Sequence, residues 1–166
     1  MKKALLTLAT LLAPTFASAA GEHAGGHDDD HGAMNGHAMA LGAPAEGEPT
    51  RTVEIVMNED YDADSVYVFD KKALEFAAGE TVRLHIINAG EEVHEFVMDT
   101  AAANAEHKEL MAKFPEMEHD DPNSVRLEPG EEAEILWTFG EPGTFEFACL
   151  LPGHYEAGMH GPLTVN

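Results

Sequence analysis

The sequence is poor in cysteine and in positive charge. A single cysteine among 166 residues excludes an intrachain disulfide. Lysine and arginine together number 9 against 31 acidic residues, so the net charge is −22. A chain this acidic repels phosphate backbones and anionic lipid headgroups, which argues against nucleic acid and membrane surfaces as partners. Tryptophan occurs once, whereas histidine occurs 10 times and methionine 8 times, so side chains that bind metals are the unusual part of the composition.

The sequence also lacks an apolar run of the roughly 20 residues that a membrane-spanning helix needs. The apolar stretch at 4–13 is short, follows two lysines and precedes the small-residue triplet Ala-Ser-Ala at 17–19. This is the pattern of a cleaved secretory signal peptide. We therefore interpret residues 1–20 as a bacterial signal peptide and expect a periplasmic protein, with no membrane insertion after cleavage. In an exported protein a lone cysteine is a buried inert thiol, an intermolecular bridge or a metal ligand.

Residues 21–50 are a low-complexity segment without apolar periodicity, and we predict a disordered tail there. The tail is rich in His, Met and Asp, and these side chains offer imidazole, thioether and carboxylate donors. These donors predict weak, exchangeable binding of metal ions such as copper by the tail. The alternative is a solvated acidic linker that binds nothing. The candidate ligands in the tail are His23, His27, His31, His37, Met34 and Met39.

From residue 51 onward the pattern changes to that of a folded domain. Apolar and polar residues alternate over 53–57, which is typical of a half-buried strand. Further strands are predicted at 66–68, 81–88, 93–98, 124–127, 133–139, 144–149 and 163–165. Thr100 as an N-cap and Pro115 as a stop predict one helix between them. Many short strands separated by Pro/Gly turns, with one lateral helix, indicate an all-β sandwich or barrel over residues 51–166.

The end of the chain carries three metal-binding side chains at the spacing Cys-x4-His-x4-Met, namely Cys149, His154 and Met159. Cys149 closes a predicted strand, and the glycines and proline that follow allow the loop to curl back. His94 begins another predicted strand, at a comparable end of the sandwich. Two imidazoles, one thiolate and one weak thioether form the ligand set of a type 1 copper site. Zinc is the alternative metal, but it prefers four closed N, S or O ligands.

Residues 51–166 resemble the cupredoxin family in two stretches, AAGETVRLHIINAGEEVHEF and GTFEFACLLPGHYEAGMHGPLTV. The resemblance implies a Greek-key β-sandwich in which an Asn-x-Gly turn delivers His94 and the last long loop delivers Cys149, His154 and Met159. The last long loop resembles that of rusticyanin-like members. The His-rich tail resembles that of periplasmic cupredoxins of copper tolerance. One departure is Glu95, where the family often has a small hydrogen-bonding residue. A carboxylate there would favour Cu(II) and alter hydrogen bonding around the cysteine sulfur.

A second group of candidate ligands lies in and after the predicted helix. His107 and Met111 are four residues apart and share a helix face. Together with Met117 and His119 they form a candidate Cu(I) site. The alternative is a helix that covers one end of the barrel, followed by a solvated loop.

These features predict a protein that is not an enzyme, because four donors fill the copper site and no general acid/base pair or nucleophile motif is evident. The favoured hypothesis is copper tolerance, in which the protein binds and redox-cycles periplasmic copper. One alternative is a soluble electron carrier, whose acidic surface would suit a basic redox partner such as a cytochrome. Another is a copper chaperone.

Overall fold

The structure is a computed structural model and describes residues 40–114 and 121–166. The predicted signal peptide, the part of the predicted tail before residue 40, and Met117 and His119 lie outside the described residues. Within the described part of the chain, no helix has the length and apolar character required to cross a membrane.

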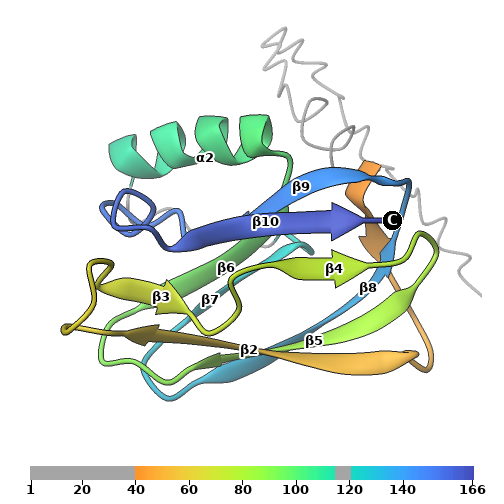
Figure 1. The fold of residues 1–166 in the computed structure, drawn as a ribbon, viewed down its shortest axis with the longest axis horizontal. Coiled ribbons are helices and arrows are strands. Elements are labelled where there is room, and N and C mark those ends of the chain that lie inside the picture. Colours follow the sequence, from red (N-terminus) through yellow and green to blue (C-terminus); the bar gives the residue numbers. More distant parts are fainter. Residues whose placement is uncertain (1–39, 115–120) are drawn as a thin grey trace, which may run out of the picture.

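Two five-stranded sheets face each other and form a sandwich (Figure 1). In spatial order, the first sheet consists of β1 (Gly42–Pro44), β8 (Glu132–Phe139), β5 (Thr81–Asn88), β2 (Arg51–Glu59) and β3 (Tyr67–Phe69). The second consists of β4 (Leu74–Phe76), β10 (His160–Val165), β9 (Gly143–Ala148), β6 (His94–Asp99) and β7 (Ser124–Leu127). The predicted all-β sandwich with one lateral helix is therefore confirmed.

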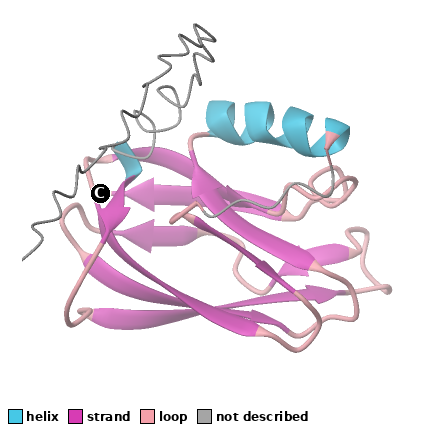
Figure 2. Ribbon diagram, turned by 180° about the vertical axis from the view of Figure 1, so that it is seen from behind, coloured by secondary structure: helices cyan, strands magenta, loops and turns pink. Residues whose placement is uncertain are grey.

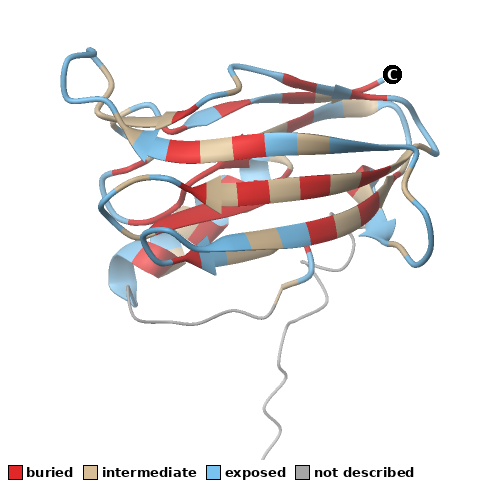
Figure 3. Ribbon diagram, turned by 90° about the horizontal axis from the view of Figure 1, so that it is seen from below, coloured by how far each residue is buried: buried red, intermediate tan, exposed pale blue. Residues whose placement is uncertain are grey.

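Alternation of apolar and polar residues fixes which face of each strand is buried (Figure 3). In β5 every second residue is buried, and Val82, Leu84 and Ile86 point into the core. A slip of one residue against β2 or β8 would turn these side chains to solvent, so the pattern also sets the register. The largest fully buried side chains include Trp137, Phe96, Phe139 and Phe147.

Helix α2 (Ala101–Lys113) lies against the outer side of the second sheet, on β6 and β9 (Figure 2). The Thr100 side chain accepts a hydrogen bond from the Ala103 N–H at 3.1 Å, which confirms the predicted N-cap. All six residues of β6 are buried, and α2 contributes to this burial from the outer side. His107 and Met111 do share one helix face, and that face is buried, with Met111 in the hydrophobic core. The burial of this face favours the covering helix over a Cu(I) site on it.

The predicted tail ends too late, because residues 40–50 belong to the folded domain. Leu41 is fully buried, and β1 pairs antiparallel with β8. The Leu41 carbonyl accepts hydrogen bonds from the Gly140 N–H at 2.9 Å and from the Trp137 indole N–H at 3.4 Å. Gly42 has a φ of 132°, and a Cβ there would lie 2.0 Å from the Thr138 carbonyl oxygen. Three-residue strands such as β1 and β4 are too short to show a period, which is why the sequence pattern missed both.

We predict that Leu41→Ala destabilises the protein by about 2–5 kcal/mol, the usual cost of truncating a fully buried leucine. Unfolding in urea, followed by the fluorescence of the single tryptophan, measures the effect. The exposed residue Glu48 of the same segment provides the control, because Glu48→Ala should leave the midpoint unchanged. Equal midpoints for Leu41→Ala and the wild type would mean that this segment adds nothing to the core.

Candidate metal centre

The first loop of the candidate site joins β5 to β6 and is held by the buried side chain of Asn88. Its amide N–H donates to the carbonyls of Glu92 at 2.8 Å and Leu127 at 2.9 Å, and its oxygen accepts from the Gly90 N–H at 3.0 Å. These three bonds fold the Asn-x-Gly turn tightly back towards the sandwich. His94 follows at the first position of β6 and is completely buried.

The second loop joins β9 to β10 and lies at the end of the sandwich opposite the C-terminus (Figure 1). Cys149 comes directly after β9, and its N–H donates to the Met159 carbonyl at 2.9 Å. The Met159 N–H in turn donates to the His154 carbonyl at 3.0 Å. Gly153 and Gly158 have φ values of 90° and 95°, which residues with a Cβ rarely adopt, so they allow the chain to turn twice within the loop.

The two loops bring three of the predicted ligands together in the interior. The donor atoms of His94, Cys149 and His154 all lie within 4.8 Å of one another, and all three residues are buried. Nδ1 of His154 lies 3.3 Å from Nδ1 of His94 and 3.4 Å from Sγ of Cys149. Within the described residues this is the one group of at least three His, Cys, Asp or Glu side chains that converges in this way. Met159 is also fully buried, in the same loop.

The sequence profile of the copper-binding proteins of the plastocyanin/azurin family matches residues 55–166. The chain belongs to this family. It is a cupredoxin, and copper is its cofactor.

This cupredoxin is 39% identical over 172 residues to the "Copper-resistant cuproprotein CopI" of Rubrivivax gelatinosus, a match that covers 99% of this chain and 96% of the relative. It is 38% identical to the protein of the same name from Pseudomonas aeruginosa, over 78% of this chain and 84% of the relative. Among solved structures, auracyanin B superposes with a TM-score of 0.60 at 27% identity, over 76% of this chain and 96% of that one.

The residues present fit copper. A thiol and two imidazoles are soft and borderline donors that suit Cu(I) and Cu(II), and their spacing permits one ion to contact all three. Burial and the neighbouring His94 hold the pKa of His154 below its ordinary value, so this ring is a neutral imidazole, as a ligand must be. Burial raises the pKa of the Cys149 thiol to about 12, against the effect of the Glu95 N–H that donates to its sulfur. A cation that binds the thiolate therefore displaces a proton.

Glu95 occupies the position where the sequence departs from the family. Its backbone N–H lies 3.4 Å from Sγ of Cys149, so the hydrogen bond to sulfur comes from the main chain and survives the unusual side chain. The carboxylate is buried and accepts from the Leu150 N–H at 3.3 Å. Burial raises the pKa of Glu95 to about 7, although that hydrogen bond opposes the rise. The expectation that the Glu95 side chain alters hydrogen bonding at the sulfur is therefore not met, because this carboxylate bonds the main chain of the ligand loop at Leu150.

Two further side chains touch the site, and the sequence analysis missed both. The ring of Tyr67 in β3 stacks on His154 at 3.9 Å between centroids, and its hydroxyl donates to Glu92 at 3.1 Å. Glu59 at the end of β2 lies 2.7 Å from Nε2 of His94. Burial acts to raise the pKa of Glu59, but hydrogen bonds from the Glu91 N–H, His94 and the Glu92 N–H outweigh it and hold this pKa below its usual range. Both residues come from segments far from the ligand motifs, and no local pattern marks them.

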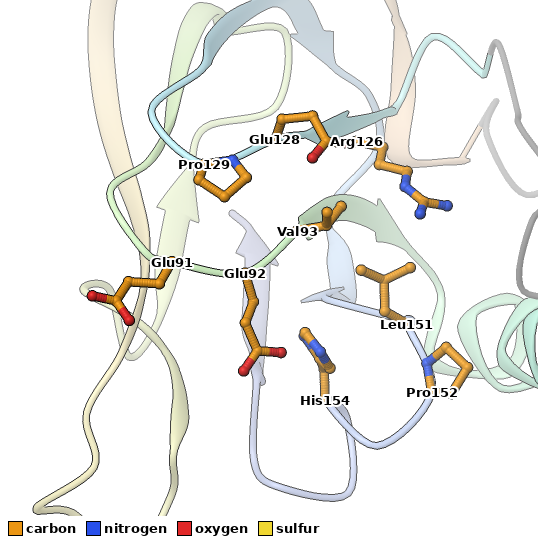
Figure 4. A pocket seen from close by; sticks show the side chains of 9 residues that line it. All are labelled: Glu91, Glu92, Val93, Arg126, Glu128, Pro129, Leu151, Pro152 and His154. Carbon is orange, nitrogen blue, oxygen red and sulfur yellow. The ribbon is translucent and has the colours of Figure 1, made fainter.

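A shallow pocket of about 450 Å³ opens beside His154 (Figure 4). Its lining includes the carboxylates Glu91, Glu92 and Glu128 and the guanidinium of Arg126. His154 is 7% exposed and lies at one side of this pocket, next to Glu92. The imidazole of His154 is thus the part of the site nearest to solvent on this face.

The other histidines of the described domain lie apart from the group. His160 is exposed on β10, stacks on Tyr155 and lies 3.7 Å from Glu146. His85 lies on the outer face of β5, 3.3 Å from Glu132. His107 belongs to the buried face of α2.

Proposed function

We propose that this cupredoxin is a periplasmic protein of copper tolerance, which binds and redox-cycles one copper ion at a type 1 site. The observation that carries the proposal is the buried convergence of His94, Cys149 and His154 in a chain that aligns over nearly its whole length with a copper-resistant cuproprotein. The leader sequence at 1–20 supports export, and the His- and Met-rich segment that follows supports contact with copper in the periplasm.

The atoms that would hold the copper are Nδ1 of His94, Sγ of Cys149 and Nδ1 of His154, and Met159 would be a fourth, weaker donor. The hydrogen bonds that join Met159 to Cys149 and to His154 support this assignment, because they tie all three residues of the loop to one another. When bound there, copper supplies one-electron redox chemistry. The protein contributes buried donors that are held in place by Asn88 and Tyr67, so that little rearrangement accompanies a change of oxidation state.

A role other than catalysis fits this arrangement best. The three converging donors are buried, and the fourth proposed donor leaves no coordination position for a substrate. A second candidate function is electron exchange with a basic protein, and the pocket beside His154 favours it. Three carboxylates line that pocket, so a positively charged surface, such as that of a periplasmic cytochrome, would be attracted to the exposed edge of the site.

We predict that Cys149→Ser abolishes the intense visible absorption of the copper-loaded protein, because that band arises from charge transfer between thiolate and Cu(II). The measurement is an absorption spectrum after Cu(II) addition, with circular dichroism to confirm the fold. His160→Ala is the matched control, since His160 adjoins the ligand loop but faces solvent, and its band should persist. A band of full intensity in Cys149→Ser would refute the ligand assignment.

We predict that Met159→Leu retains copper but raises the reduction potential. A thioether that favours Cu(II) would be replaced by a side chain of similar volume that donates nothing. Redox titration of the visible band measures the potential. Met98→Leu makes the same exchange at another fully buried methionine, in β6, and should leave the potential near that of the wild type. A potential that falls or stays constant in Met159→Leu would argue against Met159 as the fourth donor.

We predict that a strain without the gene grows poorly at raised copper, and that the wild-type gene restores growth while Cys149→Ser does not. Growth over graded copper, with and without oxygen, is the measurement. Deletion of residues 21–39 keeps both the leader and the folded domain and should preserve most of the tolerance.

Loss of tolerance on that deletion, with normal tolerance in Cys149→Ser, would instead mean that the tail sequesters copper. Normal tolerance in the null strain together with slowed respiration would favour the electron carrier.

A further inference from the structure

A buried carboxylate lies behind the first histidine of the site. We propose that Glu59 is a positioning residue for His94, which fixes the tautomer of the ring and so presents Nδ1 to the copper; this rests on the copper site proposed above. Oε1 of Glu59 lies 2.7 Å from Nε2 of His94, and the two side chains are 2% and 0% exposed.

The tautomer follows from the number of donors and acceptors. An ionised carboxylate can only accept hydrogen bonds, so Nε2 of His94 must carry the proton in this contact. In a neutral ring the lone pair is then on Nδ1. Nδ1 is the atom that faces His154, 3.3 Å from its Nδ1. The contact with Glu59 thus selects the ring nitrogen that points to the other donors.

The carboxylate itself is held in place by the loop that carries the histidine. Oε2 of Glu59 accepts from the Glu91 N–H at 2.7 Å, and Oε1 also accepts from the Glu92 N–H at 3.2 Å. With the His94 contact, three hydrogen bonds therefore converge on one carboxylate from a single loop. Glu59 clamps the loop and the ring together from the end of β2.

Gly90 provides a second, independent observation. A Cβ built on Gly90 would lie 2.5 Å from each carboxylate oxygen of Glu59 and 2.8 Å from its Cδ. Gly90 is not among the glycines with positive φ, so its backbone would accept an alanine without strain. What the missing side chain provides at this position is space for the Glu59 carboxylate.

The clamp has a consequence for the bound metal. A carboxylate that accepts a hydrogen bond from a ligating imidazole makes the ring a stronger donor and favours the more highly charged metal ion. Glu59 should therefore increase the affinity of the site for Cu(II) and lower its reduction potential. Removal of such a partner commonly costs about 10- to 100-fold in metal affinity.

Three variants separate the hydrogen bond from the charge. Glu59→Ala removes both, and Gly90→Ala displaces the carboxylate without altering it. Glu59→Gln removes the charge, but its amide oxygen can still accept from His94 and the Glu92 N–H if the bond from the Glu91 N–H is given up. Glu54→Gln is the matched control, because it removes the same charge from an exposed position of the same strand, where Glu54 is 60% exposed.

The first measurement uses the copper-free protein and long-range ¹H–¹⁵N NMR of the His94 ring. The wild type, Glu54→Gln and Glu59→Gln should show the Nε2–H tautomer. Glu59→Ala and Gly90→Ala should show a mixture of tautomers. Thermal unfolding of each copper-free variant identifies any variant that fails to fold. If Glu59→Ala does not fold, Glu59→Gln keeps the test valid.

The second measurement uses the copper-loaded protein. Glu59→Ala and Gly90→Ala should bind Cu(II) about 10- to 100-fold more weakly than the wild type, as measured by competition with a chelator. Glu59→Gln should keep most of the affinity but show a raised reduction potential, whereas Glu54→Gln should match the wild type in both.

Two results would overturn the proposal: an Nδ1–H tautomer in the wild type, or wild-type tautomer, affinity and potential in both Glu59→Ala and Gly90→Ala. A wild-type protein that shows no thiolate-to-copper band would refute the copper site itself. The tautomer experiment needs no metal, so the two failures can be told apart.

Discussion

The pairing of β6 with β9 is the constraint on which the metal centre depends. These strands run antiparallel, and Val97 lies opposite Ala148 in the register. Cys149 directly follows Ala148, so this register places it beside the start of β6. There the Glu95 N–H donates to the Cys149 sulfur, and His94 is the preceding residue of β6. A shift of one residue would turn Cys149 to the opposite face of the sheet. The apolar side chains that both strands bury in the core prevent that shift, because it would turn them away from the core.

The difference between local motifs and distant contacts explains what could be predicted from the sequence and what could not. His94, Cys149 and His154 were predicted because the Asn-x-Gly turn before β6 and the spacing Cys-x4-His-x4-Met after β9 are local patterns. Glu59 and Tyr67 were not predicted, because each meets the site through the packing of β2 or β3 against distant loops. Strand β1 was not predicted for a related reason. Its packing depends on Leu41 and Gly42, and two residues form no periodic pattern.

Two carboxylates lie close to His94, and their surroundings give them different characters. Glu59 receives hydrogen bonds from two backbone N–H groups and from the ring, and its pKa falls despite burial. Glu95 receives one such bond from Leu150, and burial raises its pKa to about 7. Burial thus dominates the pKa of Glu95, whereas at Glu59 the hydrogen bonds outweigh burial.

The place where β1 joins the sandwich has a consequence for the segment that precedes it. β1 pairs with β8, with Gly42 opposite Phe139, at the end of the sandwich where the C-terminus also lies, whereas the loop that joins β9 to β10 lies at the other end (Figure 1). The His-rich sequence before residue 40 is therefore attached at the end of the domain opposite the candidate copper site.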